Sequence, residues 1–341
     1  MNRATPAVLS TGLVSAVGLT APATCAAVRS KVSNPSLTGF VHAGKPITGH
    51  QVPLDRPWRG VEKLARMGAM AAEEALEEVP RGERERIPLL LCVAETERPG
   101  RIQGSEDALF GLLQRATACG VPGSSRVLAK GRTGVPTALA LARTMIEEGS
   151  VSRVLILAVD SLLTAGTVAH YAGNDRLLTD DNSNGFMPGE AAGAVMLGPV
   201  TAGKPHLLCA GFGFAEEHAC LDSQHPLRGE GLAAAVKGAL ADAEADIDEV
   251  ACRITDLSGE QYYFKEASLA LSRTLRKRGE NPELWHPAES VGEVGAASGA
   301  ICLAVANAAI LKHYMPAGGT VLMHFSADAG ERAAILAVPG S

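Results

Sequence analysis

The chain has 341 residues, of which 46% are hydrophobic, and it carries a formal net charge of −6. Its length allows one large core or two fused smaller ones. The acidic balance and the lack of any Lys/Arg run of five or more argue against a nucleic-acid partner bound through a basic patch. No apolar run reaches the length of a membrane span. The 37 glycines and the low aromatic content of 4% are typical of helices packed closely against a buried sheet.

The seven cysteines are widely spaced, and no CxxC pair occurs. Most stand in apolar stretches, such as LLCV at residues 90–93, which is typical of buried thiols in a reducing cytoplasm. We therefore expect a cytoplasmic protein with no metal and no other cofactor, since zinc ligands come in close pairs. The apolar residues 7–19, followed by Ala-Pro-Ala at 21–23, leave a secretory signal peptide as the alternative.

Taken in chain order, the first predicted elements are two helix–strand pairs. Apolar residues recur at helical spacing over residues 64–79, and a strand is predicted at 87–94. A more apolar helix is predicted at 134–149, followed by a buried strand at 153–159. Because helices alternate with strands, the pattern predicts parallel pairing through crossover connections.

The second part of the chain repeats this order. A helical stripe at residues 232–243 precedes a strand-like run at 251–257. A buried helix is predicted from residue 295 to about 315, and a strand at 320–325. Helices that are apolar on all sides belong in the middle of a layered core.

This internal repeat divides the chain near residues 198–204. We therefore expect an N-terminal half at 1–200 and a C-terminal half at 201–341. The run GFGFAE at 211–216 lacks the third glycine of a dinucleotide-binding loop, so it is interpreted as the strand that opens the second half.

Three segments are similar to signature segments of a known family. They read TGLVSAVG at residues 11–18, NGFMPGEAAGAVML at 184–197 and SVGEVGAASGA at 290–300. The first resembles the opening strand and turn of the β-ketoacyl synthases, the second their DGFxxGEGAG strand, and the third their GHxxAASG turn into a buried helix. The resemblance covers nearly the whole chain. It implies the α/β thiolase-like fold, with five layers α-β-α-β-α made of two similar halves.

The family uses a Cys thiolate, placed just before the first buried helix, to take up an acyl group. In LAKGRTG at residues 128–134, the Cys position falls on Gly131 or Arg132, and neither can attack a thioester. Thr133 would need an adjacent base to act as a nucleophile, so we expect its hydroxyl to cap the helix. Arg132 suits either an anionic ligand or a structural ion pair.

The family's two catalytic His residues are also replaced. The first position falls between Asp256 and Ser258, and the second is Glu293, whose register the neighbouring glycines fix. The supporting Lys of the family aligns with Ala288, and its GFGGTN loop corresponds to SADAGE at residues 326–331. The resemblance therefore implies a scaffold without the residues that polarise a malonyl carbonyl.

The replacing residues have two interpretations. Asp256, Glu260 and Glu293, together with Arg132 and Lys130, could form a new acid–base site. They could equally form an ion-pair cluster that fills a former cavity.

Non-catalytic binding is the function we expect first, in a role comparable to that of a chain-length-factor subunit. The partner would be a second copy or a related subunit, with an acyl carrier protein, another protein client or an acyl ligand also bound. One alternative is an acyltransferase or condensing enzyme that acts on acyl-ACP or acyl-CoA thioesters with altered residues. The other is an adaptor or structural component of an unrelated bacterial assembly, because a fold does not fix function. The aromatic run YYF at residues 262–264 suits a pocket mouth, a partner surface or plain core packing.

Overall fold

The computed structural model describes residues 5–121, 123–201, 203–276, 282–316 and 318–340. Within them, ten strands hydrogen-bond in one continuous order, which falls into two sets of five. The first set is β1 (Ala7–Val14), β4 (Leu89–Val93), β5 (Arg126–Ala129), β6 (Val154–Ser161) and β7 (Glu190–Gly198). The second set is β8 (His206–Glu216), β9 (Cys252–Thr255), β10 (Glu283–Trp285), β11 (Val321–Ser326) and β12 (Glu331–Gly340).

The two sets share one pairing pattern. The first runs β1-β7-β6-β4-β5, with two antiparallel pairings followed by two parallel ones. The second runs β8-β12-β11-β9-β10 with the same sequence of pairings. Between β1 and β8, only Ala7 with Leu208 and Val8 with Leu207 pair, so the two sets meet along a short seam.

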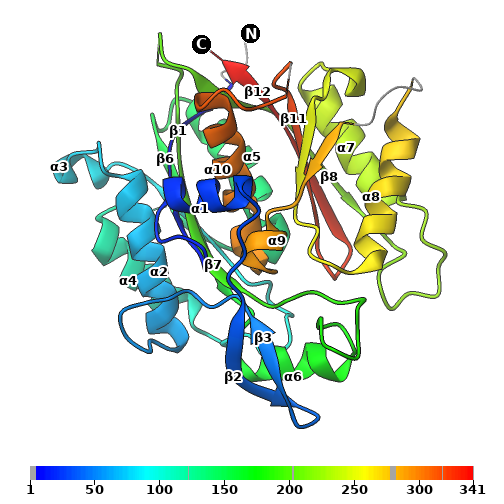
Figure 1. Ribbon diagram of the computed structural model, residues 1–341. Helices are drawn as coiled ribbons and strands as arrows, with labels where there is room; N and C mark the ends of the chain where they lie inside the picture. Colours follow the sequence, from blue (N-terminus) through cyan, green and yellow to red (C-terminus); the bar gives the residue numbers. More distant parts are fainter. Residues whose placement is uncertain (1–4, 122, 202, 277–281, 317, 341) are drawn as a thin grey trace.

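The helices cover and separate these two strand sets. They are α1 (Ala21–Arg29), α2 (Gly60–Ala75), α3 (Arg81–Arg84), α4 (Glu106–Thr117), α5 (Gly134–Glu147), α6 (Ala165–Gly173), α7 (Glu230–Asp242), α8 (Gln261–Thr274), α9 (Ala288–Val291) and α10 (Ser298–Leu311). Figure 1 shows α5 and α10 between the sets, α2 and α4 outside the first, and α7 and α8 outside the second. The hairpin of β2 (Ser36–His42) and β3 (Lys45–Gly49) lies beside α6 at one end. The architecture is therefore α-β-α-β-α, as the motifs predicted.

Small residues bring the two central helices together. A Cβ atom on Gly299 of α10 would lie 2.6 Å from the Cβ of Val135 on α5, so only glycine allows this approach. Nearly every residue of α10 is buried, which agrees with its lack of a polar face in the sequence.

Two helix boundaries differ from the sequence-based expectation. The first helix spans α2, residues 60–75, rather than 64–79, although Leu76 and Val79 are still buried. Val79 precedes Pro80, and a residue before proline is disfavoured in helical geometry. The helix expected from residue 295 begins with a 3-10 turn at Gly295–Ala297, and α10 ends at Leu311, shortly before the left-handed residue His313. In the described part of the chain, no helix has both the length and the apolar content needed to cross a membrane.

Candidate functional site

Both central helices begin from a tight turn that requires glycine. A 3-10 turn at Gly131–Thr133 precedes α5, and the turn at Gly295–Ala297 precedes α10, in contact with the first. Gly131 and Gly295 have φ values of 51° and 54°, in the left-handed region. A Cβ atom at Gly131 would lie 2.2 Å from Oε2 of Glu95, and one at Gly295 would lie 2.2 Å from Oδ2 of Asp160. Each turn is thus packed directly against a carboxylate.

Arg132 lies at the centre of a buried charge cluster. Its side chain is 11% exposed, and its Nη2 is 2.5 Å from Oδ1 of Asp328. Its Nη1 is 3.6 Å from Oε2 of Glu293 and 3.8 Å from Oδ2 of Asp256. The guanidinium also lies over the ring of Tyr263, 4.8 Å from its centroid. One guanidinium therefore lies within ion-pair distance of three carboxylates, which come from three different segments.

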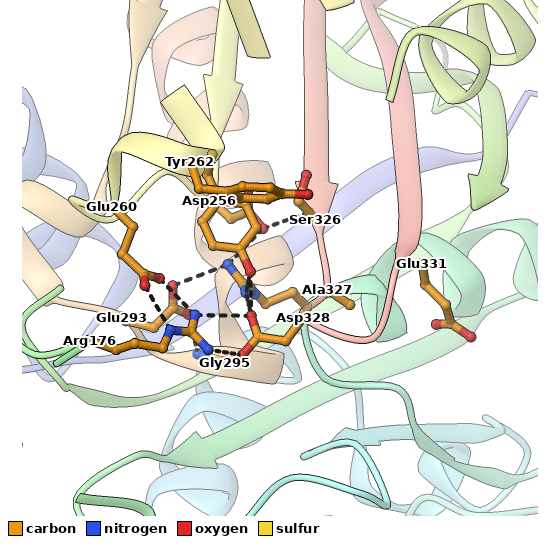
Figure 2. A network of polar contacts seen from close by, with 12 residues as sticks. Arg176, Asp256, Glu260, Tyr262, Glu293, Gly295, Ser326, Ala327, Asp328 and Glu331 are labelled. Atoms are coloured by element: carbon orange, nitrogen blue, oxygen red, sulfur yellow. Dashed lines mark hydrogen bonds and ion pairs between the residues drawn. The ribbon is translucent and has the colours of Figure 1, made fainter. Parts of the chain in front are cut away.

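A second arginine extends the cluster, as Figure 2 shows. Arg176 donates from Nε and Nη2 to the two carboxylate oxygens of Glu260, at 2.7 and 2.8 Å. Its Nη1 donates to Oδ2 of Asp328 at 2.6 Å. Asp328 therefore bridges Arg176 and Arg132, and it also accepts hydrogen bonds from the hydroxyls of Tyr171 and Tyr263.

The amides at the start of α10 already have anionic partners from the chain itself. The amide of Ala296 donates to Oδ2 of Asp160 at 2.9 Å, and the amide of Gly295 donates to Oε1 of Glu293 at 2.9 Å. Asp160 is held in turn by a two-bond pair with Arg98, at 2.6 and 2.7 Å. A helix N-terminus favours negative charge, and here two side chains supply it.

The three carboxylates around Arg132 differ in proton affinity. Burial raises the pKa of Asp256 to about 7; Arg132 opposes this shift and Glu293 adds to it. Burial likewise raises the pKa of Glu293, although Arg132 and a hydrogen bond from Ser258 counteract it. For Asp328, burial also acts upward, but Arg132 and Arg176 outweigh it and hold its pKa well below the usual range. The cluster therefore contains one firmly ionised carboxylate and two that retain protons more readily.

These side chains leave little open space. The cavity bordered by Glu95, Arg98, Arg132, Glu260 and Asp328 has a volume of about 20 Å³, which is room for about one water molecule. A larger cavity of about 550 Å³ lies in the first half of the chain, and Arg98 lines it as well. Within the described residues, no group of three His, Cys, Asp or Glu side chains is arranged to hold a metal ion.

The residues expected from the sequence are only partly brought together. Arg132, Asp256 and Glu293 converge, and Ser258 hydrogen-bonds to Glu293. Gly131 supplies the turn beside them.

Thr133 and Lys130 lie apart from this cluster. The Thr133 hydroxyl donates to Oε2 of Glu331 at 2.7 Å and does not cap α5, so the expected cap was wrong. A capping hydroxyl accepts from an amide of the first helical turn, and its residue has an extended backbone. Thr133 instead has helical φ and ψ values of −89° and 0°, and its hydroxyl lies against the start of β12. Lys130 pairs with Glu331 at the surface, 2.7 Å away, rather than with the buried carboxylates.

Sequence reasoning missed Arg176, Asp328, Arg98 and Asp160. Asp328 stands in the segment 326–331, which was aligned with a family loop but not considered as a charged partner. A count of charges was the available signal: the three expected carboxylates outnumber the two expected cations, Arg132 and Lys130, so a further cation is needed to balance them. Arg176, eight positions before Asn184 of the NGFMPGEAAG segment, supplies it.

No protein-family model matches the sequence, and no curated protein matches it. Solved structures match over nearly the entire chain. A structure of a type II polyketide synthase acyl-carrier protein in complex with its ketosynthase bound to a hexaketide has 17% identity and a TM-score of 0.81, covering 99% of this chain and 100% of that one. The ishigamide ketosynthase/chain length factor has 18% identity and a TM-score of 0.74, covering 98% and 99%.

A ketosynthase in complex with its chain length factor from Xenorhabdus doucetiae has 15% identity and a TM-score of 0.70, covering 98% of each chain. These likenesses span both strand sets and all five layers, because almost no residue of this chain is left outside them. The protein therefore has the thiolase-like fold of the ketosynthases.

Proposed function

We propose that this protein is a ketosynthase-fold subunit that does not condense acyl groups and works by binding. The observation that carries the proposal is the charge cluster in front of α5 and α10, which leaves a cavity of only about 20 Å³. By the sequence resemblance, Arg132 or Gly131 takes the Cys position and Glu293 takes a His position. A buried guanidinium is no nucleophile, and a carboxylate repels the enolate charge that a His would stabilise.

The cysteines support the same proposal. All seven are free thiols, and six of them are buried. Burial raises the pKa of every one, including Cys92 and Cys302 near the central helices. The thiolate is the reactive form, so none of these groups is a good nucleophile at neutral pH. Free thiols also agree with the reducing cytoplasm as the place where the protein works.

A related ketosynthase-type subunit is the partner that we infer, with an acyl carrier protein or an acyl ligand as a further binding partner. Support comes from the similar solved structures, which are described as complexes with a chain length factor or an acyl-carrier protein. The 550 Å³ cavity offers space for an acyl chain, with an apolar wall that includes Phe40, Leu64 and Leu109. Its polar side holds two ion pairs, Lys63 with Glu190 and Arg98 with Asp160.

The test is the intact mass of the protein after incubation with a panel of acyl-CoA and acyl-ACP thioesters. We expect no added mass, while an active ketosynthase in the same mixture becomes acylated. Binding of the same acyl carrier protein is measured in parallel by calorimetry, and binding without acylation is the expected result. An acyl adduct that maps to one residue would contradict the proposal and would identify the nucleophile.

The competing function is an enzyme on acyl thioesters with altered residues, and the pKa of Asp256 near 7 favours it, because such a group suits acid–base work at neutral pH. Turnover that is abolished by both Arg132→Ala and Glu293→Ala would establish this enzyme. An adaptor in an unrelated assembly would show neither an acyl adduct nor turnover. It would bind a protein partner that has no acyl chemistry.

A further inference from the structure

Two basic side chains are buried side by side on the outer face of the second strand set. Arg253 of β9 is 8% exposed, and His324 of β11 is 2% exposed. The parallel register pairs Arg253 with Leu322 and His324 with Thr255, so both side chains face α7 and α8. They line the same cavity, whose volume is about 10 Å³.

Neither side chain has a polar partner in the described part of the chain. Arg253 Nε and His324 Nδ1 are fully buried atoms without a hydrogen bond. The described residues also offer Arg253 no carboxylate within ion-pair distance, in contrast to Arg332 on the same sheet face, which pairs with Glu266 at 2.7 Å. The Nη atoms of Arg253 are not among these fully buried unpaired atoms, so the unmet groups are its Nε donor and the His324 ring. A buried donor without an acceptor is unfavourable, so a bound acceptor is expected between them.

The walls of the cavity contain no acidic group among the described residues. They are formed by apolar and hydroxyl side chains: Leu232, Val236, Ala267, Ala270, Leu271 and Thr274. Glu266, the buried carboxylate of α8, is already held by Arg332 and by the Ser326 hydroxyl at 2.9 Å. Among the described residues, Arg253 is therefore supplied with no negative charge.

We propose that this cavity binds one monovalent anion of halide size, which is chloride in solution, between Arg253 and His324. The volume admits about one atom, so phosphate and carboxylate groups are too large. Burial lowers the pKa of His324 to about 3, so its ring is neutral at physiological pH and donates one N–H. A single negative charge then balances the single charge of Arg253. This site is independent of the charge cluster at α5 and α10, and of the function proposed above.

Thermal unfolding of the full-length protein tests the site. At equal ionic strength, we expect chloride and bromide to raise Tm in a saturable manner relative to gluconate, which is too large to enter. Arg253→Met should remove this difference. The matched control is Arg273→Met on the exposed face of α8, where the guanidinium contacts Glu230 and the backbone carbonyl of Arg228; it should keep the halide effect. Equal Tm values in chloride and gluconate would overturn the proposal.

A second measurement needs no variant, and it decides the matter if Arg253→Met does not fold. Crystals of the unaltered protein grown in bromide should show an anomalous peak between the Arg253 guanidinium and the His324 ring. Electron density of a water molecule there, without anomalous signal, would show that the cavity holds only solvent and would refute the anion site.

Discussion

Arg132 is the side chain on which the buried carboxylates of Asp256 and Glu293 and the half-buried carboxylate of Asp328 depend. Asp256 and Glu293 have no other cation at ion-pair distance among the described residues, whereas Asp328 also contacts Arg176. Asp256 and Glu293 are partly compensated by backbone amides, since Ser326 donates to Asp256 and Gly295 to Glu293. Buried ion pairs add little net stability over apolar packing, but removing one partner is costly.

Arg132→Ala should therefore lower the free energy of unfolding by about 3–5 kcal/mol. The variant leaves three carboxylates with one fewer cation and opens the space above the Tyr263 ring. Urea denaturation measures the effect. Arg276→Ala is the control, because that side chain is 77% exposed and pairs with Asp246 at the surface; it should change stability by no more than about 0.5 kcal/mol. Equal effects from the two variants would contradict the buried cluster.

Asp256 gives the protein a pH dependence with a definite sign. Its pKa is about 7 in the folded state against an ordinary 3.8, so the folded state binds the extra proton. The stability contributed by that proton is complete below about pH 3.8 and is lost as the pH rises through about 7. Unfolding free energy should thus fall between pH 5 and pH 8.

Asp256→Asn should reduce the decrease in unfolding free energy between pH 5 and pH 8 by at least about 1 kcal/mol, because a tenfold change in proton affinity corresponds to about 1.4 kcal/mol. Urea titrations at both pH values measure it. The control is Glu249→Gln at an exposed site, which should show the same decrease in unfolding free energy as the unaltered protein. An unchanged pH dependence in Asp256→Asn would show that Asp256 is ionised throughout.

At the scale of elements, the turns before α5 and α10 are equivalent. Each has a left-handed glycine at its first position, and each packs that glycine against a carboxylate: Glu95, just beyond the end of β4, and Asp160, near the end of β6. The two turns contact each other, so Glu293 meets both the Arg132 side chain of the first turn and the Gly295 amide of the second.

Gly131→Ala should destabilise the protein by about 2 kcal/mol or more, because the left-handed φ and the contact with Glu95 both oppose a Cβ atom. Gly111→Ala in α4 is the matched control. There a Cβ would meet only the flexible end of Arg115, at 3.4 Å. This control should be neutral or raise stability by up to about 1 kcal/mol, and both effects can be read from thermal unfolding. Similar stability of the two variants would mean that the turn before α5 shifts to accommodate the added Cβ atom.

At the scale of the whole molecule, each strand set ends in an edge that has no pairing partner among the described residues. β5 and β10 are the outermost strands of the order, and an open strand edge favours pairing with another chain. A four-residue edge such as β5 is too short to form an assembly alone, so packing of neighbouring loops would have to contribute.

We expect the purified protein to form a dimer at micromolar concentration, with a mass of twice 35.2 kDa by light scattering. The thiolase-like fold motivates this expectation. If the purified protein is a monomer but forms a stable one-to-one complex with an added related ketosynthase, the result would indicate a heterodimer instead. A monomer that binds no such subunit would count against the proposed function.

The sequence by itself determined the alternation of strands and helices, the two buried central helices, and four members of the cluster: Arg132, Asp256, Glu260 and Glu293. Hydrophobic periodicity and glycine-rich motifs are local signals, so they can be recognised in the sequence without any knowledge of tertiary contacts. Only the tertiary structure decided which charges meet. Arg132 and Asp328 are 196 positions apart, and Arg176 and Glu260 are 84 apart. No local pattern encodes such pairings, because they arise when two similar strand sets place their loops in one space.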